Sequence, residues 1–294
     1  MSAMEGSSHE AGGQAEAAWQ RAVRAVECAA REFAVAERHE RLHVENGKAL
    51  HARMAERHRA VAERHLTTAR LQESYARRVR EWTAGHHPPV KAEDGCRPLF
   101  MAGVAEACGT SSAALTLVGD DLNQLAVAAS DRASRGAQDL EYVLTAGPAR
   151  DAARQRRPVY ASGAALERRW PGYGSGLSAL GLNSVAALPL KAPQGCIGAL
   201  ALFDPRPALA RSGVLAEVAE ALTEDVLLGP DADPWLYGGA DIRAVVHQAA
   251  GTLSQQAGRS VADALALIKA RAFALGESPE WVSRRVMSGE LKLR

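Results

Sequence analysis

The strongest constraint on the fold is a seven-residue repeat in the first third of the chain. Residues 15–83 contain no proline and are rich in Ala, Glu, Arg and His. Counting by sevens from Trp19 gives Val26, Phe33, Glu40, Gly47, Met54, Val61, Thr68, Tyr75 and Trp82, most of them large and apolar. The position three residues later begins with alanines, which permit close approach of two helices. Such a repeat is typical of a coiled coil, so we expect a long helix over residues 15–85.

Asn46-Gly47 is the weak point of this helix, because a glycine in a helix interior costs about 1 kcal/mol relative to alanine. The helix either continues through this point or folds back into a hairpin of two shorter helices, and we favour the continuous helix. A lone amphipathic helix of this length exposes its apolar seam to water, so we expect a homodimer. The seam would consist of Trp19, Val26, Phe33, Met54, Val61, Tyr75 and Trp82.

The motif Ala-Glu-Arg-His occurs three times, ending at His39, His58 and His65, and His51 belongs to the same seven-residue series as the last two. Imidazoles titrate near neutral pH, so a histidine stripe can sense pH or bind a metal. Two histidines seven residues apart on one helix lie about two turns from each other, too far for one metal ion. We interpret the histidines as a polar flank of the coiled coil and expect no metal site.

Composition suits a folded, multidomain protein. The chain has 294 residues, is 47% hydrophobic and has a formal net charge of +1, which indicates no particular partner. Its cysteines (Cys28, Cys96, Cys108 and Cys196) stand singly, without the spacing of a zinc site or a disulfide framework. Residues 1–14, which we expect to be disordered, lack a signal-peptide pattern, and no apolar run reaches membrane-spanning length. We expect a cytoplasmic protein.

Catalytic motifs are missing from the sequence. It contains no Gly-x-Ser-x-Gly elbow, Walker loop, His-Glu-x-x-His or Gly-x-Gly-x-x-Gly after a strand. Residues 118–121 (Val-Gly-Asp-Asp) resemble the acidic pair of a receiver domain, but a second strand is predicted directly after them, which favours a hairpin turn. We therefore expect a protein that is not an enzyme and has no metal site.

The middle of the chain alternates predicted helices and strands. His86-His87-Pro88-Pro89 ends the helical region and starts a linker over 86–98. Beyond it we predict helices over 99–108, 138–155 (interrupted near Gly147-Pro148) and 213–228. Strands are predicted over 113–118, 124–129, 182–190 and 197–203, with a short extended piece at 158–160. This mixture predicts an α+β domain over 99–228, followed by a second linker over 229–240.

Five short segments carry a family resemblance: residues 140–151, 157–159 (Arg-Pro-Val), 169–171 (Arg-Trp-Pro), 188–190 (Leu-Pro-Leu) and 198–200 (Gly-Ala-Leu). With the order of elements, they resemble a GAF domain, the small-molecule-sensing α+β fold that precedes the ANTAR domain in actinobacterial regulators. The frequent Gly-Pro-Cys of these relatives reads Gly147-Pro148-Ala149 here. The resemblance implies a sensor domain and leaves its cofactor or effector unknown.

Three aromatic residues are candidates for an effector pocket in this domain. Tyr142, Trp170 and Tyr173 could line it, with Cys196 on a nearby strand. The alternative is that these aromatic residues belong to the core, which is the more common role of such side chains.

The last segment, residues 241–294, divides into three short amphipathic helices. Gly258 and Gly276 are positioned to end the first two, Ser260 to cap the second, and Ser278-Pro279 to begin the third. The sequence predicts a compact three-helix bundle.

This bundle resembles an ANTAR domain, the RNA-binding module of bacterial transcription antiterminators. The resemblance rests on residues 246–251 (Val-His-Gln-Ala-Ala-Gly), Ser260 to Ala264, Leu267 to Lys269, and the pair Val282 and Val286. The family's lysine before the glycine is Ala250 here, and the apolar residue expected after Leu253 is Ser254.

The two resemblances together imply a signal-responsive RNA-binding regulator, a transcription antiterminator that acts on leader hairpins in nascent RNA. Two copies would present their C-terminal bundles to paired RNA hairpins. The alternative is a GAF regulator that acts through protein partners, its ANTAR-like tail having lost RNA binding with the lysine. The candidate RNA-binding residues are Arg243, Gln248, Ala249, Gly251, Lys269, Arg271, Arg284 and Arg285.

Overall fold

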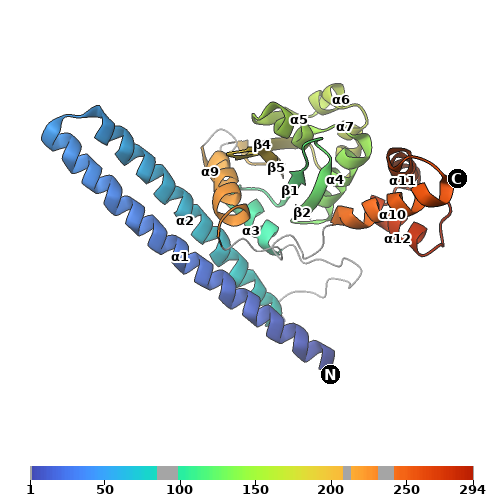
Figure 1. Ribbon diagram of the computed structural model, residues 1–294, viewed down its shortest axis with the longest axis horizontal. Coiled ribbons are helices and arrows are strands. Elements are labelled where there is room, and N and C mark those ends of the chain that lie inside the picture. Colours follow the sequence, from blue (N-terminus) through green and yellow to red (C-terminus); the bar gives the residue numbers. More distant parts are fainter. Residues whose placement is uncertain (1, 85–98, 208–212, 231–241, 294) are drawn as a thin grey trace.

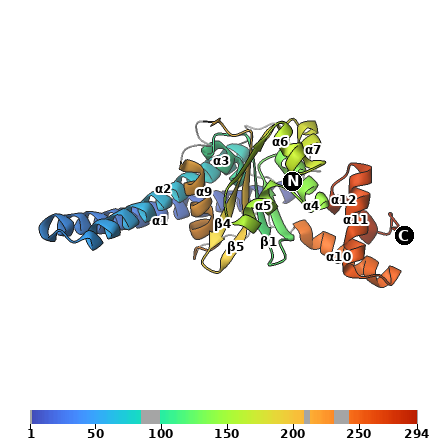
Figure 2. The same cartoon turned by 90° about the horizontal axis from the view of Figure 1, so that it is seen from above.

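The computed structural model describes residues 2–84, 99–207, 213–230 and 242–293. These residues form a helical hairpin, a central α+β domain and a C-terminal helical bundle. Figures 1 and 2 show the hairpin projecting from one side of the central domain and the bundle lying at the opposite side. The two expected linkers, 86–98 and 229–240, fall largely outside the described residues.

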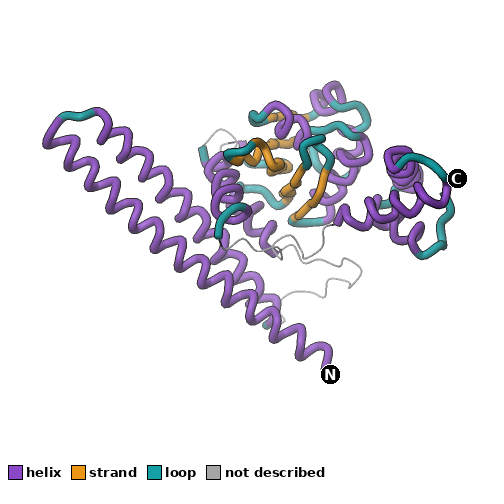
Figure 3. Tube along the Cα trace, in the orientation of Figure 1, coloured by secondary structure: helices purple, strands orange, loops and turns teal. Residues whose placement is uncertain are grey.

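The N-terminal region is a hairpin of two antiparallel helices, so the expected continuous helix is wrong. Helix α1 (Ser2–Asn46) and helix α2 (Ala49–Thr83) lie side by side (Figure 3). The chain reverses at Gly47, whose φ of +66° suits a residue without a side chain. The Asn46 side chain accepts a hydrogen bond from the Lys48 amide at 3.0 Å and fixes the turn. The weak point of the heptad pattern is therefore the turn.

Alanines form the contact between the two helices. Ala22, Ala25, Ala29 and Ala36 are buried on α1, and Ala55, Ala62 and Ala69 are buried on α2 in a strict seven-residue series. Small side chains let two helices approach closely, and a repeat of seven keeps them aligned over several turns. A seven-residue repeat is present as predicted, but its register was wrong on α2, where the buried alanines each lie one residue after the expected Met54, Val61 and Thr68. The residues that occupy the contact are the small ones.

The seam that we expected from the large apolar residues is not a single face of the hairpin. Trp19 and Val26 are exposed, whereas Phe33, Met54 and Val61 are only half-buried. Tyr75 is buried against the central domain, edge-on to Phe100 with ring centroids 5.8 Å apart, and Trp82 packs against the same core. Antiparallel pairing turns the alanines inward and moves the large residues to the flanks.

The start of the chain also differs from expectation. We expected residues 1–14 to be disordered, but α1 begins at Ser2. Ala11 and Ala15 are buried in the core that joins the hairpin to the central domain, so the last part of this stretch is packed.

The central domain is built on a five-stranded antiparallel sheet with the order β2-β1-β5-β4-β3. The strands are β1 (Ser112–Val118), β2 (Gln124–Ala129), β3 (Val159–Ser162), β4 (Ser184–Ala192) and β5 (Gly195–Phe203). Strand β5 lies in the centre, where Gly198 approaches the backbone of β1 so closely that a Cβ would meet the Thr116 carbonyl oxygen at 2.0 Å. The expected strands are thus present, with ends that lie within two residues of the predicted bounds.

Helices cover both faces of the sheet (Figure 2). Helices α2, α3 (Leu99–Ala107) and α9 (Val214–Ala221) cover one face, and the π-helix η2 (Leu222–Leu227) follows α9 there. Helices α4 (Arg132–Leu144), α5 (Pro148–Gln155), α6 (Ala164–Arg169) and α7 (Tyr173–Ala179) cover the other. Along β5, Leu200 and Leu202 face the hairpin side while Ala199, Ala201 and Phe203 face the α4 side. This alternation is what a strand buried on both faces requires.

Asp225 in the π-helix connects the hairpin to the central domain. Its carboxylate accepts hydrogen bonds from Thr68 Oγ1 at 2.8 Å, His65 Nδ1 at 2.9 Å and Arg64 Nε at 3.2 Å. The donors are all on α2, so the hairpin is held by polar contacts as well as by apolar packing. One histidine of the repeated motif therefore has a structural role at this joint.

The C-terminal bundle consists of α10 (Ile242–Ala257), α11 (Val261–Leu275) and α12 (Pro279–Met287), as predicted. Ser260 caps α11 by accepting a hydrogen bond from the Asp263 amide, and Ser278 caps α12 in the same way with the Trp281 amide. Gly276 ends α11 with a φ of +64°. Within the described part of the chain, no helix is long and apolar enough to cross a membrane.

Candidate functional site

A fully buried arginine joins the C-terminal bundle to the central domain. Arg243, in the first turn of α10, donates from Nη1 to Glu280 Oε1 of α12 at 2.5 Å. Its Nη2 donates to Asp139 Oδ1 of α4 at 2.9 Å and to Gln124 Oε1 of β2 at 2.8 Å. A guanidinium is suited to this position because its planar fork directs several donors at fixed angles. One side chain thus connects three elements, two of which belong to the central domain.

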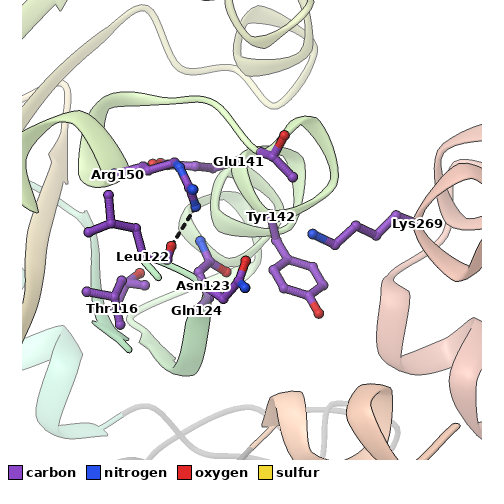
Figure 4. A pocket seen from close by; sticks show the side chains of 10 residues that line it. Thr116, Leu122, Asn123, Gln124, Glu141, Tyr142, Arg150 and Lys269 are labelled. Carbon is purple, nitrogen blue, oxygen red and sulfur yellow. Dashed lines mark hydrogen bonds between the residues drawn. The ribbon is translucent and has the colours of Figure 1, made fainter. Parts of the chain in front are cut away.

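Two cations lie close to the ring of Tyr142 at the same junction. Tyr142 is on α4, and its ring packs with the apolar residues of the bundle. The Arg243 Cζ atom lies 4.1 Å from the ring centroid and Lys269 Nζ of α11 lies 4.0 Å from it. Figure 4 shows the Lys269 side chain extending toward this ring from the bundle. Cations over an aromatic face are attracted by its quadrupole, more strongly where water is excluded.

Charges at the junction are nearly balanced. Arg135 on α4 pairs with Asp139 at 3.5 Å and with Glu280 at 3.4 Å, so three cations (Arg135, Arg243 and Lys269) meet two carboxylates. Burial raises the pKa of Asp139, and the Arg243 charge opposes that rise. Burial, followed by the nearby Arg243 charge, lowers the pKa of Lys269 to about 8. Burying these charged groups costs hydration free energy, and the ion pairs that they form with one another offset that cost.

A chain of buried polar groups continues from this junction into the sheet. Gln124, which accepts from Arg243, lies within 3.4 Å of Gln138 Oε1 through its Nε2 donor. Gln138 Oε1 also accepts from Thr116 Oγ1 of β1 at 2.6 Å. Thr116, Gln124 and Gln138 are all buried. Strand β1 is thus linked to the C-terminal bundle by consecutive hydrogen bonds.

A small cavity lies beside this chain (Figure 4). Its volume is about 10 Å³, which corresponds to roughly one water molecule. The lining residues come from the β1–β2 hairpin, α4, the start of α5 and α11: Thr116, Val118, Leu122, Asn123, Gln124, Glu141, Tyr142, Thr145, Arg150 and Lys269. Lys269 is the residue of the bundle that lines the cavity.

Glu141 on α4 is a buried acid next to this cavity. Its carboxylate accepts hydrogen bonds from the Arg150 amide at 2.5 Å and the Ala149 amide at 3.3 Å, so it caps the N-terminus of α5. Burial raises the pKa of Glu141 to about 7, while the two backbone hydrogen bonds oppose the rise. Gly147 is required beside it, since a Cβ there would lie 2.5 Å from the Glu141 carboxyl carbon.

The expected effector pocket is not assembled as one site. Trp170 and Tyr173 meet edge-on with centroids 6.1 Å apart, and both belong to the core between the sheet and α4–α7. Tyr142 is on the opposite side of α4 and faces the bundle instead. Cys196 is half-buried on β5, and its thiol donates to the Gly198 carbonyl oxygen at 3.1 Å. The sequence does not show which face of α4 carries Tyr142. The prediction therefore placed Tyr142 in the same pocket as Trp170 and Tyr173.

The expected RNA-binding residues divide into two sets. Gln248, Arg271, Arg284 and Arg285 are exposed on the bundle. Arg285 also pairs with Glu290 at 3.0 Å and lies over the Trp281 ring at 4.6 Å. Arg243, Ala249 and Lys269 are buried and Gly251 is half-buried. Arg243 and Lys269, the two buried cations, are both engaged at the junction.

Ala250, which replaces the lysine of the ANTAR signature, is fully buried in the bundle core with Ala249 and Val246. A lysine at this position would have to thread its aliphatic stem out of the core to place its charge in water. Alanine fits the packing of the three helices in this chain.

Reasoning from the sequence missed the residues that pair with Arg243, two of them in the central domain and one on α12. Asp139, Gln124 and Glu280 lie far from Arg243 in sequence and belong to no motif. One signal was present: a charged residue in the first turn of a helix whose neighbours are apolar is unusual unless a partner neutralises it.

Three histidines, two of them from the repeated motif, meet near the tip of the hairpin. His39 Nδ1 on α1 lies 2.9 Å from His51 Nδ1 on α2, and the His39 and His58 rings are stacked with centroids 5.7 Å apart. His58 Nδ1 also lies 2.6 Å from Glu32 Oε2. Loss of hydration, then the charges of His51 and His58, lowers the pKa of His39. The hairpin thus brings together histidines that a single helix would keep apart, although no group of three or more residues in the described chain could hold a metal ion.

Comparison with known proteins identifies the central domain. A family model described as a GAF domain matches residues 99–226. Among solved structures, the chain is similar to the GAF domain of an Acinetobacter phosphoenolpyruvate-protein phosphotransferase. The identity is 16%, over 52% of this chain and 90% of that one, with a TM-score of 0.31. No curated protein matches the chain. Residues 99–226, which carry the sheet and two of the acceptors of Arg243, Asp139 and Gln124, are a GAF domain.

Proposed function

We propose that this protein is a signal-responsive RNA-binding regulator, a transcription antiterminator that acts on nascent leader RNA in the cytoplasm. The observation that carries the proposal is a GAF domain joined to a three-helix bundle that exposes Gln248, Arg271, Arg284 and Arg285. The GAF domain would bind a small-molecule effector, and the bundle would be the output. Regulation without catalysis agrees with the lack of a catalytic motif in the sequence.

RNA contact would use the exposed arginines first. Arg271, Arg284 and Arg285 are placed to neutralise phosphates, which supplies affinity without reading sequence. Specificity would come from unpaired loop bases near Gln248 and Gly251 on α10, because the bases of an RNA loop can be splayed out and read by side chains. The small Gly251 leaves open space, since nothing lies within 4 Å of where its Cβ would be.

Two copies would present two bundles to paired RNA hairpins. The exposed flank of α1 supports association, since Trp19, Val23 and Val26 recur at helical spacing and are exposed. Light scattering of the full chain tests this part, with a Val23→Glu and Val26→Glu double variant as the comparison. A monomeric wild-type protein would rule out association by this flank.

RNA binding is tested by fluorescence anisotropy with a labelled RNA containing two hairpins, over a range of salt concentrations. Replacing Arg284 and Arg285 by alanine should weaken binding across sequences and reduce the slope of log K against log salt by about one to two. The matched control replaces the adjacent exposed pair Arg156 and Arg157 of the GAF domain, which should change neither quantity. If wild-type protein binds the hairpins no better than an unstructured RNA at low salt, direct RNA binding is refuted.

A second function is favoured by the apolar surface of the bundle. Val261, Phe273, Leu275 and Met287 are all exposed, and Phe273 is 61% exposed. Exposed large apolar side chains mark protein interaction sites when they cluster. The bundle would then act on a protein partner, its RNA affinity having been lost along with the lysine that Ala250 replaces. If the wild-type protein binds no hairpin RNA and a Phe273→Ser variant abolishes regulation in cells, this alternative is supported over antitermination.

A further inference from the structure

The junction around Arg243 contains residues from both of the sites that the sequence suggested. Tyr142 was a candidate for effector binding, and Arg243 and Lys269 were candidates for RNA phosphate contacts. The structure places all three in one contact, where Arg243 is 0% exposed and Lys269 is 8% exposed. Cations that face α4 of the GAF domain cannot contact a phosphate at the same time.

We infer that this junction is an autoinhibitory clasp: the GAF domain holds the C-terminal bundle closed by sequestering Arg243 and Lys269, and opening of the clasp exposes them to RNA. The inhibitory part of this inference rests on the proposed function, whereas the clasp itself does not. Regulation would then change which cations are available, in addition to how two bundles are positioned.

The division of the contacts explains how the clasp can open without unfolding either part. The Arg243–Glu280 pair joins α10 to α12 inside the bundle, so it stays formed when the bundle moves away. Asp139, Gln124 and Tyr142 belong to the GAF domain and are the groups that Arg243 loses on opening. The pair between Arg135 of α4 and Glu280 is lost as well. Arg243 therefore keeps one carboxylate partner in the open state, which lowers the cost of exposing it.

The clasp is also connected to the interior of the GAF domain. Gln124 and Gln138 link Arg243 to Thr116 in the central part of the sheet. Glu141 and Tyr142 are neighbours on α4, and both line the small cavity that Lys269 also lines. A ligand or strand movement that displaces this polar chain would remove acceptors from Arg243. The inner groups of the domain thus have a direct effect on the clasp.

Asp139→Asn is the variant that tests the clasp, because it neutralises the carboxylate on the GAF side and leaves the bundle's own pair intact. Hydroxyl-radical footprinting of the full chain, read by mass spectrometry, measures exposure of the Tyr142 ring. Tyr173 is an internal reference, since it is 0% exposed in the core on the other side of α4 and becomes labelled only if the domain unfolds. We expect Tyr142 labelling to rise about tenfold or more, because removing one partner of a buried ion pair is strongly destabilising, while Tyr173 stays protected.

The matched control is Asp151→Asn, the same substitution in the same domain. Asp151 pairs with Arg154 at 2.8 Å and Arg169 at 3.1 Å, away from the junction. It should leave Tyr142 protected. If Asp139→Asn labels Tyr142 no faster than Asp151→Asn does, the clasp is refuted, whatever RNA binding shows.

RNA affinity of the same variants tests inhibition. Asp139→Asn should bind the two-hairpin RNA about tenfold more tightly than wild type, with a steeper salt dependence, because two further cations reach phosphates. Exposure of Tyr142 without any gain in affinity refutes inhibition while leaving the clasp in place. Should none of the proteins bind RNA, the proposed function fails, and the Tyr142 footprint still decides whether the clasp exists.

Discussion

Replacing a single alanine in the hairpin contact by leucine tests the packing of α1 against α2. Ala29 is 2% exposed, and its neighbours along the contact, Ala22, Ala25 and Ala36, are equally small. Leucine adds three carbons, which would contribute roughly 2 kcal/mol if they were buried without strain. A contact made of alanines has no space for them, so the helices must separate and lose packing on both sides of the new side chain. Overpacking of this kind costs about 1–3 kcal/mol net.

The adjacent residue provides the control, since Ala30 is exposed on the same helix. Ala30→Leu should change stability by less than about 0.5 kcal/mol. The hairpin is one of several units, so a single melting temperature does not isolate it. Native-state hydrogen exchange of the α1 amides does, and Ala29→Leu should accelerate it by roughly 5- to 150-fold. Exchange in Ala29→Leu that is as slow as in Ala30→Leu would show that alanines do not form the contact.

Two further predictions concern the GAF domain. Burial raises the pKa of Glu141 from 4.5 to about 7, so the stability that its protonated form contributes is complete below pH 4.5 and is lost as the pH rises through 7. The free energy of unfolding should therefore fall by about 3 kcal/mol between pH 4.5 and 8. Denaturant titrations at several pH values measure this profile, and Glu141→Gln should flatten it. Gly198→Ala should destabilise the domain by more than about 3 kcal/mol, because its Cβ would meet the Thr116 carbonyl oxygen. The control is Gly13→Ala in α1, which has open space around it and should be neutral or stabilising by up to about 1 kcal/mol. Equal melting curves for the two variants would contradict the close approach of β5 to β1.

Elements defined by local chemistry could be predicted from the sequence. The bundle helices begin and end at residues whose side chains or φ angles set those limits, such as Ser260 and Gly276. The strands of the GAF domain show short apolar runs bounded by turn residues. This pattern can be recognised without knowing which parts of the chain pack against the strands. Helices α6 and α7 were missed because they are short and bounded by glycines, which gives them little periodic pattern.

Features that depend on distant residues could not be predicted in the same way. A heptad repeat is compatible with both a continuous helix and a hairpin, since Gly47 itself falls on the repeat. Alanine carries too little hydrophobic contrast to reveal that it forms the contact. The clasp joins Arg243 to an aspartate on α4 that no motif links to it. Only the folded arrangement shows which candidate residues are available and which are already engaged.

The hairpin and the C-terminal bundle lie far apart in Figures 1 and 2, but both are connected to strand β1 through opposite faces of the sheet. Leu115 and Thr116 are consecutive in β1, but Leu115 packs in the core shared with the hairpin and Thr116 begins the polar chain to Arg243. Consecutive residues of a strand project to opposite faces and are about 3.4 Å apart along it. A tilt of α2 and a change on the α4 side would therefore act on the same short piece of backbone. Strand β1 can in this way combine a movement of the hairpin with a change on the α4 side before either affects α10, α11 and α12.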